Sequence, residues 1–294
     1  MLIDSHCHVQ FSAYKNDAEE VIKRCQEKNV VLNVVGSQRD TSERAIEYAN
    51  KYDNIYATVG LHPVHLCSTE VDEEEIKFKT REETFDYEFY KKLVSDPKVI
   101  GIGECGLELF HLPENLDKTE VLKKQKDAFV QQYNLAQEFG LPLVIHVRDA
   151  HEEMVELLQK LVSATPHPEP SPARRGKMTG VVHCYSANWQ YAQQYLNFGL
   201  YLGFTGIITF PPKKTNPKQQ LDLLEVVKKC PLDKILIETD APYLAPQAYR
   251  GERCEPWMVE EVAKKIAEVR GLNFEDVCKI TVENTKRLFS KISK

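Results

Sequence analysis

The N-terminal stretch Met1-Leu2-Ile3-Asp4-Ser5-His6-Cys7-His8 decides how the rest of the chain is interpreted. Strand-forming residues lead into two histidines that are separated by a single residue. Because residues i and i+2 of a β-strand point to the same face, His6 and His8 should present two imidazoles side by side at the end of a strand. Imidazole is the commonest metal ligand among side chains, so the pair supplies half of a metal site. A bare H-x-H also occurs by chance, so the other half must come from elsewhere in the chain.

Seven further short apolar runs follow, and polar segments with helical spacing separate them. Apolar runs of about four to eight residues bounded by turn residues are typical of strands that are buried on both faces. The predicted strands after the first are residues 30–36, 55–61, 99–105, 141–147, 180–185, 199–204 and 235–240. Strands that alternate with helices in this way indicate a parallel sheet, and eight such units predict a closed (β/α)8 TIM barrel of the α/β class.

Two more helices are predicted after the last strand, over residues 255–270 and 274–292. We therefore expect a single domain, residues 1–294, built as a barrel with extra C-terminal helices. A doubly wound open sheet is the alternative architecture. Residues 165–177 read TPHPEPSPARRGK, and we expect this proline-rich, basic-ended insertion to be mobile. It follows a predicted helix and precedes a strand, so it should lie at the end of the barrel away from the catalytic face.

The composition is that of a globular protein with an acidic balance, with 42% hydrophobic and 28% charged residues and a net charge of -6. The negative charge argues against a broad basic surface that binds nucleic acid non-specifically, although a local basic cleft is compatible with it. The eight cysteines form no C-x-x-C pair, and neither a secretory leader nor an apolar run of about 18 residues is recognised. We therefore expect a cytoplasmic protein with reduced thiols and no membrane contact.

Ionisable residues stand at the carboxyl ends of most of the predicted strands. They are His6 and His8 on the first strand, followed by His62, Glu104, His146, His183, Glu238 and Asp240. In a barrel these ends form one mouth, where active sites lie. Burying so many titratable groups among apolar neighbours is costly unless they share a charge partner. Two divalent cations bridged by one carboxylate would satisfy the whole group.

Seven stretches of the chain carry a further resemblance. They are D-S-H-C-H (4–8), V-G-L-H-P (59–63), I-G-E-C-G-L (102–107), P-L-V-I-H-V-R-D-A (142–150), V-H-C-Y-S (182–186), L-G-F-T-G (202–206) and I-E-T-D-A-P-Y-L-A-P (237–246). In this order, and spread over nearly the whole chain, they resemble the TatD family of metal-dependent deoxyribonucleases, within the amidohydrolase-like metal hydrolases. The set is far more specific than any one of its motifs.

The resemblance implies two divalent cations per subunit. The ligands would be His6, His8 and Asp240 for the first cation and His146 and His183 for the second, with Glu104 bridging them. These side chains must be deprotonated to bind metal. We expect Mg²⁺ or Mn²⁺ to support activity, and histidine-rich ligation is compatible with Zn²⁺ as well.

The resemblance also implies that His62 contacts substrate phosphate or supports the ligands and that Glu238 orients them, and Asp240 is our candidate general base. Arg148 and Tyr185 adjoin ligands in the sequence and are candidate phosphate contacts, as is Arg250. Further basic residues could line the same mouth, namely Lys213, Lys214, Lys218 and Arg253.

The implied activity is that of a 3′–5′ exonuclease that hydrolyses phosphodiester bonds in DNA with single-stranded or frayed ends, acting as a monomer. Three departures from the family pattern stand out. Glu108 occupies a position where the family usually has Asp, R-C-E-P at 253–256 replaces Arg-Asn-Glu-Pro, and Tyr185 replaces Phe. None removes a metal ligand, and the first two bear on how a substrate would be positioned.

Two alternatives follow from the same residues. The first is hydrolysis of amide, lactone or ester bonds, including removal of D-amino acids from tRNA, because the same metals activate water whatever the electrophile. Basic groups in the mouth would favour the nuclease, whereas an apolar, enclosed pocket would favour a small-molecule hydrolase. The second is a binding scaffold with an inactive site, against which the complete ligand set argues.

Overall fold

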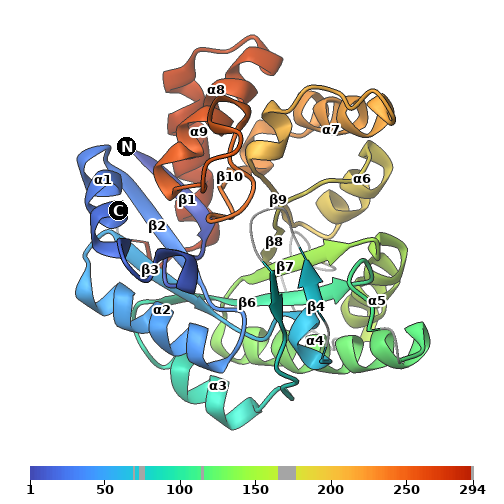
Figure 1. Cartoon of the computed structure of the whole chain (residues 1–294). Helices are drawn as coiled ribbons and strands as arrows, with labels where there is room; N and C mark the ends of the chain where they lie inside the picture. The colour runs from blue at the N-terminus through green and yellow to red at the C-terminus, as the bar shows by residue number, and fades with distance from the viewer. Residues whose placement is uncertain (69, 73–76, 114–115, 165–176, 293–294) are drawn as a thin grey trace.

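The computed structural model describes residues 1–68, 70–72, 77–113, 116–164 and 177–292. Its main sheet has eight strands in the order β1-β2-β3-β6-β7-β8-β9-β10 and curls into a nearly closed barrel (Figure 1). The strands are β1 (Leu2–Cys7), β2 (Val30–Val35), β3 (Ile55–Val59), β6 (Val99–Glu108), β7 (Leu143–Arg148), β8 (Gly180–Val182), β9 (Tyr201–Phe204) and β10 (Ile235–Ile237). All seven ladders between neighbours are parallel.

Helices surround the barrel (Figure 1). Their buried apolar side chains belong to the same hydrophobic core as those of the strands. The α-helices are α1 (Ala18–Glu27), α2 (Arg39–Lys51), α3 (Tyr87–Val94), α4 (Lys118–Phe139), α5 (His151–Ala164), α6 (Trp189–Asn197), α7 (Pro217–Lys229), α8 (Val259–Arg270) and α9 (Phe274–Leu288). Short 3-10 helices are η1 (Ser12–Tyr14), η2 (Pro63–Leu66), η3 (Gly206–Thr209), η4 (Leu232–Lys234), η5 (Gln247–Tyr249) and η6 (Pro256–Met258). A separate antiparallel hairpin consists of β4 (Glu70–Asp72) and β5 (Lys77–Lys79).

The long helix α4 shows how local sequence sets the helix ends. Asp117 precedes the first turn, and its carboxylate accepts a hydrogen bond from the backbone N of Thr119 at 2.7 Å. At the other end Gly140 takes the left-handed conformation with φ of 63°, which glycine adopts without a Cβ penalty. The acidic cap and the terminal glycine thus fix where this helix begins and ends.

The inside of the barrel is divided into an apolar layer and an ionisable layer. The apolar layer takes one residue from each of six strands and is joined by the end of the chain, and its members include Ile3, Ile100, Val144, Val181, Tyr201, Leu236, Leu288, Phe289 and Ile292. Two positions after Val144, Val181 and Leu236 come His146, His183 and Glu238. Because side chains repeat with period two along a strand, the same inward faces change from apolar to ionisable toward the carboxyl ends.

The barrel closes where β10 approaches β1. The buried carboxylate of Asp4 accepts hydrogen bonds from Thr239, at 2.5 Å from Oγ1 and at 2.9 Å from the backbone N. The backbone N of Asp240 donates to the carbonyl of His6 at 2.9 Å, and that of His8 donates to the carbonyl of Ala241 at 2.7 Å. These hydrogen bonds join the two edge strands of the sheet, β1 and β10, and place Asp240 beside His6 and His8.

The predicted barrel is confirmed, because the first and last strands meet and an open sheet is thereby excluded. The helices after β10 also follow the prediction, although α9 ends at Leu288 rather than at residue 292. The sequence does not predict the β4–β5 hairpin, since strands of three residues give too short a pattern to recognise. Residues 165–176 of the expected insertion lie outside the described residues.

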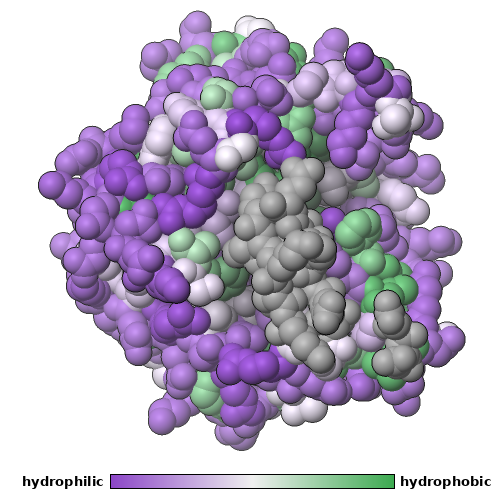
Figure 2. All heavy atoms as spheres, in the orientation of Figure 1, coloured by the Kyte–Doolittle hydropathy of each residue, from purple (hydrophilic) through white to green (hydrophobic). Residues whose placement is uncertain are grey.

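The surface is largely hydrophilic on the face that Figure 2 shows, and its hydrophobic residues form small separate groups. None of the helices in the described part of the chain combines the length and apolar character needed to cross a membrane. All eight cysteines are described and each is a free thiol, as expected.

Gly106 lies where β6 and β7 approach closely beside the mouth. Its φ is +154°, and a Cβ at this position would collide with the carbonyl oxygen of His146. We expect Gly106→Ala to lower the free energy of unfolding by about 2–4 kcal/mol, because either strand must move. Chemical denaturation followed by circular dichroism measures the loss.

Gly140→Ala is the matched control, because Gly140 also has a positive φ of 63° but lies in open space. Apart from its chain neighbours and its own helix, no described atom is within 4 Å of the place that a Cβ would take. That substitution should cost only the conformational strain, about 1–2 kcal/mol. Equal losses in the two variants would contradict the close contact between β6 and His146.

Candidate metal centre

A cavity of about 850 Å³ opens at the carboxyl ends of the barrel strands. Most of the predicted metal ligands line it, namely His8, Glu104, His146, His183 and Asp240. His6 lies directly beside them and is fully buried. The six side chains come from β1, β6, β7, β8 and β10 or from the residues just after these strands, and the barrel brings all of them to one place.

His6, His8 and Asp240 form the first group that can hold a cation. The Nε2 atoms of His6 and His8 are 3.1 Å apart, and Oδ1 of Asp240 lies 3.7 Å and 3.3 Å from them respectively. Nδ1 of His8 donates to the carbonyl of Val35 at 2.7 Å, so the neutral ring keeps its lone pair on Nε2. Converging lone pairs from two imidazoles and a carboxylate suit a divalent cation.

Glu104 lies between this group and the other histidines. Its Oε2 is 3.4 Å from Nε2 of His6 and 3.8 Å from Nε2 of His8. Its Oε1 is 2.9 Å from Nε2 of His183 and 3.1 Å from Nδ1 of His146. One oxygen therefore faces the first group and the other faces a second pair of imidazoles, which is the arrangement expected of a bridging carboxylate.

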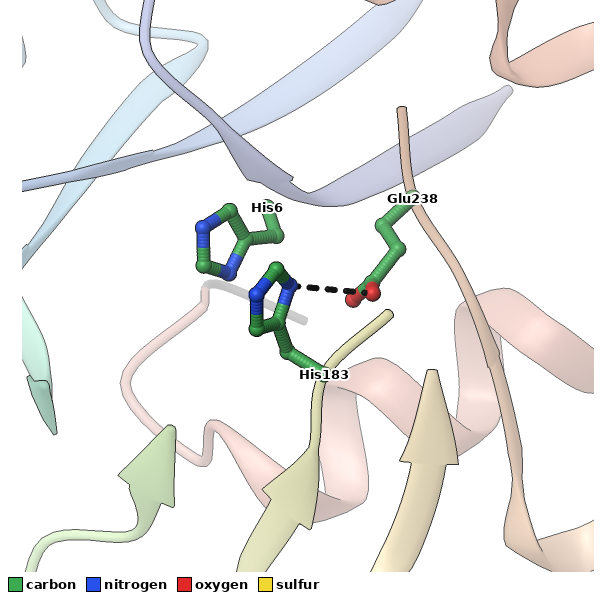
Figure 3. A group of neighbouring side chains, drawn as sticks. All are labelled: His6, His183 and Glu238. Atoms are coloured by element: carbon green, nitrogen blue, oxygen red, sulfur yellow. Dashed lines mark ion pairs between the residues drawn. The ribbon is translucent and has the colours of Figure 1, made fainter. Parts of the chain in front are cut away.

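His183 follows β8 and is held from behind by Glu238 at the end of β10. Figure 3 shows the carboxylate of Glu238 approaching the ring of His183, with Oε1 3.3 Å from Nδ1. The ring of His6 stacks on that of His183, with centroids 3.8 Å apart and an interplanar angle of 16°. A carboxylate on Nδ1 keeps the proton there and directs the Nε2 lone pair toward Glu104, as outer carboxylates do for metal-binding histidines.

His146 is held in the same way by Glu108, which in the sequence is visible only as a departure from the family pattern. Oε2 of Glu108 lies 3.1 Å from Nε2 of His146, so this ring turns Nδ1 toward Glu104. Oε1 of Glu108 accepts from the backbone N of Phe110 at 2.6 Å and of His111 at 3.1 Å. The carboxylate is 2% exposed and cannot swing away without losing these bonds.

His62 belongs to the same cluster but has a different ring polarity, meaning that the nitrogen facing Glu104 carries the proton instead of a lone pair. Its Nε2 lies 3.4 Å from Oε1 of Glu104, close enough for a group of His62, Glu104 and His146 to hold a cation. Its Nδ1, however, accepts a hydrogen bond from the backbone N of Val64 at 3.1 Å, at the start of η2. In the neutral ring the proton must then lie on Nε2, which makes this atom a donor and not a metal ligand. Burial lowers the pKa of His62 and so favours the neutral ring.

The charges in the site are mutually dependent. Burial opposes ionisation of Glu104, but the facing imidazoles of His183, His62 and His6 outweigh it and hold the pKa of Glu104 well below its usual value. Burial likewise disfavours the imidazolium of His183, yet Glu104 and Glu238 raise the pKa of His183 well above its usual value. Ionised carboxylates that demand positive partners in a buried site fit divalent cations, which would replace the imidazole protons.

The predicted substrate contacts divide into two sets. Arg148 and Arg250 line the cavity, and each guanidinium packs over an aromatic ring, 4.0 Å from the centroid of Phe110 and 4.6 Å from that of Phe210 respectively. Tyr185 does not reach the cavity, because it is buried and its hydroxyl donates to the carbonyl of Asn188 at 2.6 Å. The side chain two residues after His183 thus packs into the core, and its contact with substrate stays a prediction that the geometry does not favour.

The other basic residues are also divided. Lys213 lines the cavity, whereas Lys214, Lys218 and Arg253 are not among its described lining residues. Arg253 instead forms a bidentate pair with Asp17, at 2.9 Å and 2.5 Å. Arg253, in the R-C-E-P stretch, therefore fastens the loop after β10 to the start of α1.

Imidazoles and carboxylates gathered around a metal position at the mouth of a parallel barrel define the class of metal-dependent hydrolases. Residues 3–290 match the family model of the TatD related DNases, and the chain belongs to this family. It is thus an enzyme of the metal-dependent hydrolase class, and the resemblance seen in the sequence is confirmed.

Relatives of known sequence or structure match over nearly their whole length. The chain is 38% identical to an uncharacterized metal-dependent hydrolase, YabD of Bacillus subtilis, over 98% of this chain and 99% of the relative. It is 29% identical to the 3′-5′ ssDNA/RNA exonuclease TatD of Cronobacter sakazakii, over 99% of this chain and 98% of the relative. The crystal structure of YJJV, a TatD homologue from Escherichia coli K12, superposes with a TM-score of 0.79 at 26% identity, covering 98% of each chain.

Glu108→Gln tests whether the carboxylate behind His146 strengthens metal binding. The amide keeps the shape but removes the negative charge that makes the imidazole a better ligand, so affinity for one of the bound cations should fall about 10–100-fold. Competition with a chromogenic chelator measures the affinity. Glu225→Gln on α7, whose carboxylate pairs with exposed Lys229 at 2.6 Å, is the control and should bind metal normally. Unchanged affinity in Glu108→Gln would show that its contact with His146 is incidental.

Proposed function

We propose that this hydrolase is a 3′–5′ exonuclease that cleaves phosphodiester bonds in DNA with single-stranded or frayed ends. The observation that carries the proposal is Glu104, whose two oxygens face two separate sets of imidazoles. Two-cation sites bridged by a carboxylate are suited to in-line displacement at phosphorus. The likeness to the 3′-5′ ssDNA/RNA exonuclease of Cronobacter sakazakii supports the same substrate class.

In this proposal six residues hold two divalent cations. His6, His8 and Asp240 would hold one, and His146 and His183 would hold the other, with Glu104 shared between the two groups. Bound there, such cations would supply Lewis acidity toward a phosphate and would activate the attacking water. Mg²⁺ or Mn²⁺ would support turnover, and the nitrogen-rich ligand set would also accept Zn²⁺.

The protein's own groups complete the reaction. Burial disfavours a charge on Asp240, but the positive charge of the neighbouring His183 ring lowers its pKa, so the carboxylate is ionised and accepts the proton of the attacking water. The Nε2–H of His62 donates to a non-bridging phosphate oxygen, where negative charge grows in the transition state. Glu108 and Glu238 keep the rings of His146 and His183 in place.

The electrostatics of the mouth favour a phosphate substrate over a neutral ester or amide. The described lining contains the cationic side chains of Arg44, Arg81, Arg148, Lys213 and Arg250. The carboxylates of Glu104, Glu108 and Asp240 pair with histidine rings of the site, so cationic groups dominate the rest of the described lining. A cavity of about 850 Å³ also exceeds the needs of a small ester.

We further infer that residues 1–294 act as one domain and as a monomer, because a single chain supplies every residue of the site. A cytoplasmic location is consistent with eight free thiols, since unpaired cysteines persist in a reducing compartment.

The reaction is tested with single-stranded DNA oligomers that carry a label at the 5′ end, incubated with purified protein and Mg²⁺ or Mn²⁺. We expect progressive shortening from the 3′ end, loss of activity in excess chelator, and activity at background in Asp240→Asn and Glu104→Ala. Glu225→Gln serves as the control for the loss of a carboxylate elsewhere. Cleavage that survives chelation, or that persists in both variants, would refute the two-cation exonuclease.

His62→Ala separates a phosphate donor from a metal ligand. Because Nε2 of His62 carries the proton, its loss should lower kcat by about 100-fold or more and leave the bound metal at the wild-type stoichiometry. Elemental analysis of the dialysed variant gives the metal content. If one equivalent of metal is lost together with the activity, His62 is a ligand and the assigned ring polarity is wrong.

A further inference from the structure

Phe110 is an exposed aromatic residue beside the metal centre. Its side chain is 55% exposed, and it lines the same cavity as Glu104 and Asp240. Other large hydrophobic residues of comparable exposure in the described chain, Met1 and Leu221, lie away from this cavity. A phenyl ring kept in water at a substrate site is typical of a binding surface.

The backbone that carries this ring is fixed. The backbone N of Phe110 donates to Oε1 of Glu108 at 2.6 Å, and that of Leu109 donates to the carbonyl of Arg148 at 2.9 Å. Glu108 in turn is buried and holds His146. The ring is thus displayed from a segment that is tied to the metal centre itself, and a preorganised contact of this kind loses little entropy when a ligand binds.

Arg148 lies over the ring of Phe110, with its guanidinium carbon 4.0 Å from the centroid. It stands two residues after His146 on β7, so both side chains leave the same face of the strand, roughly 7 Å apart along it. An aromatic ring next to a guanidinium offers a stacking surface and a phosphate-binding group together. That combination matches a nucleotide, with its base on the ring and its phosphate at the guanidinium.

The same pairing occurs a second time across the mouth. Phe210 follows η3 and lies under the guanidinium of Arg250, 4.6 Å from the ring centroid, and both residues line the cavity. Ring and cation come from the loops after β9 and β10, whereas Phe110 and Arg148 come from the ends of β6 and β7. Two aromatic–guanidinium pairs on different sides of one metal centre suit a chain of nucleotides better than a single small molecule.

We propose that Phe110, backed by Arg148, is the platform on which a nucleobase adjoining the scissile phosphate stacks. The inference rests on the proposed exonuclease function and adds the base-recognition site that the metal centre lacks. Stacking of this kind accepts every base, because each base has a flat aromatic face, so the platform would hold a strand without reading its sequence.

The test measures binding of fluorescent single strands by anisotropy, with Ca²⁺ in place of the catalytic ion and strand integrity checked by gel. One strand is normal, and two others carry an abasic tetrahydrofuran residue at the last or the penultimate 3′ position. Phe110→Ala should weaken binding of the normal strand about tenfold or more. It should change binding little for the abasic strand that lacks the stacked base, because that strand has no base to lose from the ring. Phe110→Tyr should restore binding, whereas Phe110→Leu, which is apolar but not aromatic, should not.

Phe139→Ala is the matched control, because Phe139 is also exposed, at 36%, but lies at the end of α4 outside the cavity. It should bind all strands like the wild type. Wild-type affinity in Phe110→Ala, or an equal loss for normal and both abasic strands, would overturn the platform. If the wild type binds strands through Phe110 but never shortens them with Mg²⁺ or Mn²⁺, the platform stands and the exonuclease proposal falls.

Discussion

The buried carboxylate of Glu104 is the constraint on which the rest of the site depends. Imidazoles from β1, from the segments after β3 and β8, and from β7 all lie within 3.8 Å of its two oxygens. A carboxylate with 5% exposure ionises only if it has positive partners, and here their effect exceeds the cost of burial. Each imidazole ring must therefore be oriented accurately toward Glu104, and neighbouring groups fix these orientations.

Two carboxylates and two backbone groups fix the orientation of these histidine rings. Glu238 stands behind His183 and Glu108 behind His146, and each leaves the opposite ring nitrogen to face Glu104. The carbonyl of Val35 performs the same function for His8. For His62 the partner is a donor, the backbone N of Val64, and the polarity of the ring is reversed. These four histidines are thus chemically distinct although they are alike in sequence, because His8, His146 and His183 direct a lone pair into the site whereas His62 directs an N–H there.

The division of the barrel interior explains how one fold supplies both stability and chemistry. Ile3, Val144, Val181 and Leu236 fill the amino-terminal half together with Phe289 from the end of the chain. The next inward positions on β7, β8 and β10 carry histidine or glutamate, so the ionisable layer rests on a packed apolar base. In the sequence the strands appear as short continuous apolar runs, and the ionisable residues at their carboxyl ends allowed the barrel and the metal-competent residues to be predicted together.

The sequence by itself determined the eight apolar strands, their alternation with helices, and the histidines and carboxylates at the strand ends, because these depend on local periodicity. Only the tertiary structure decided which side chains face one another. In it Glu108 contacts His146, Tyr185 is buried in the core, and Arg253 pairs with Asp17 away from the mouth. It also set which ring nitrogen of His62 carries the proton, through Val64, and placed the guanidinium of Arg148 over the ring of Phe110. Contacts of this kind join residues through side-chain direction and strand register, which a linear pattern does not encode.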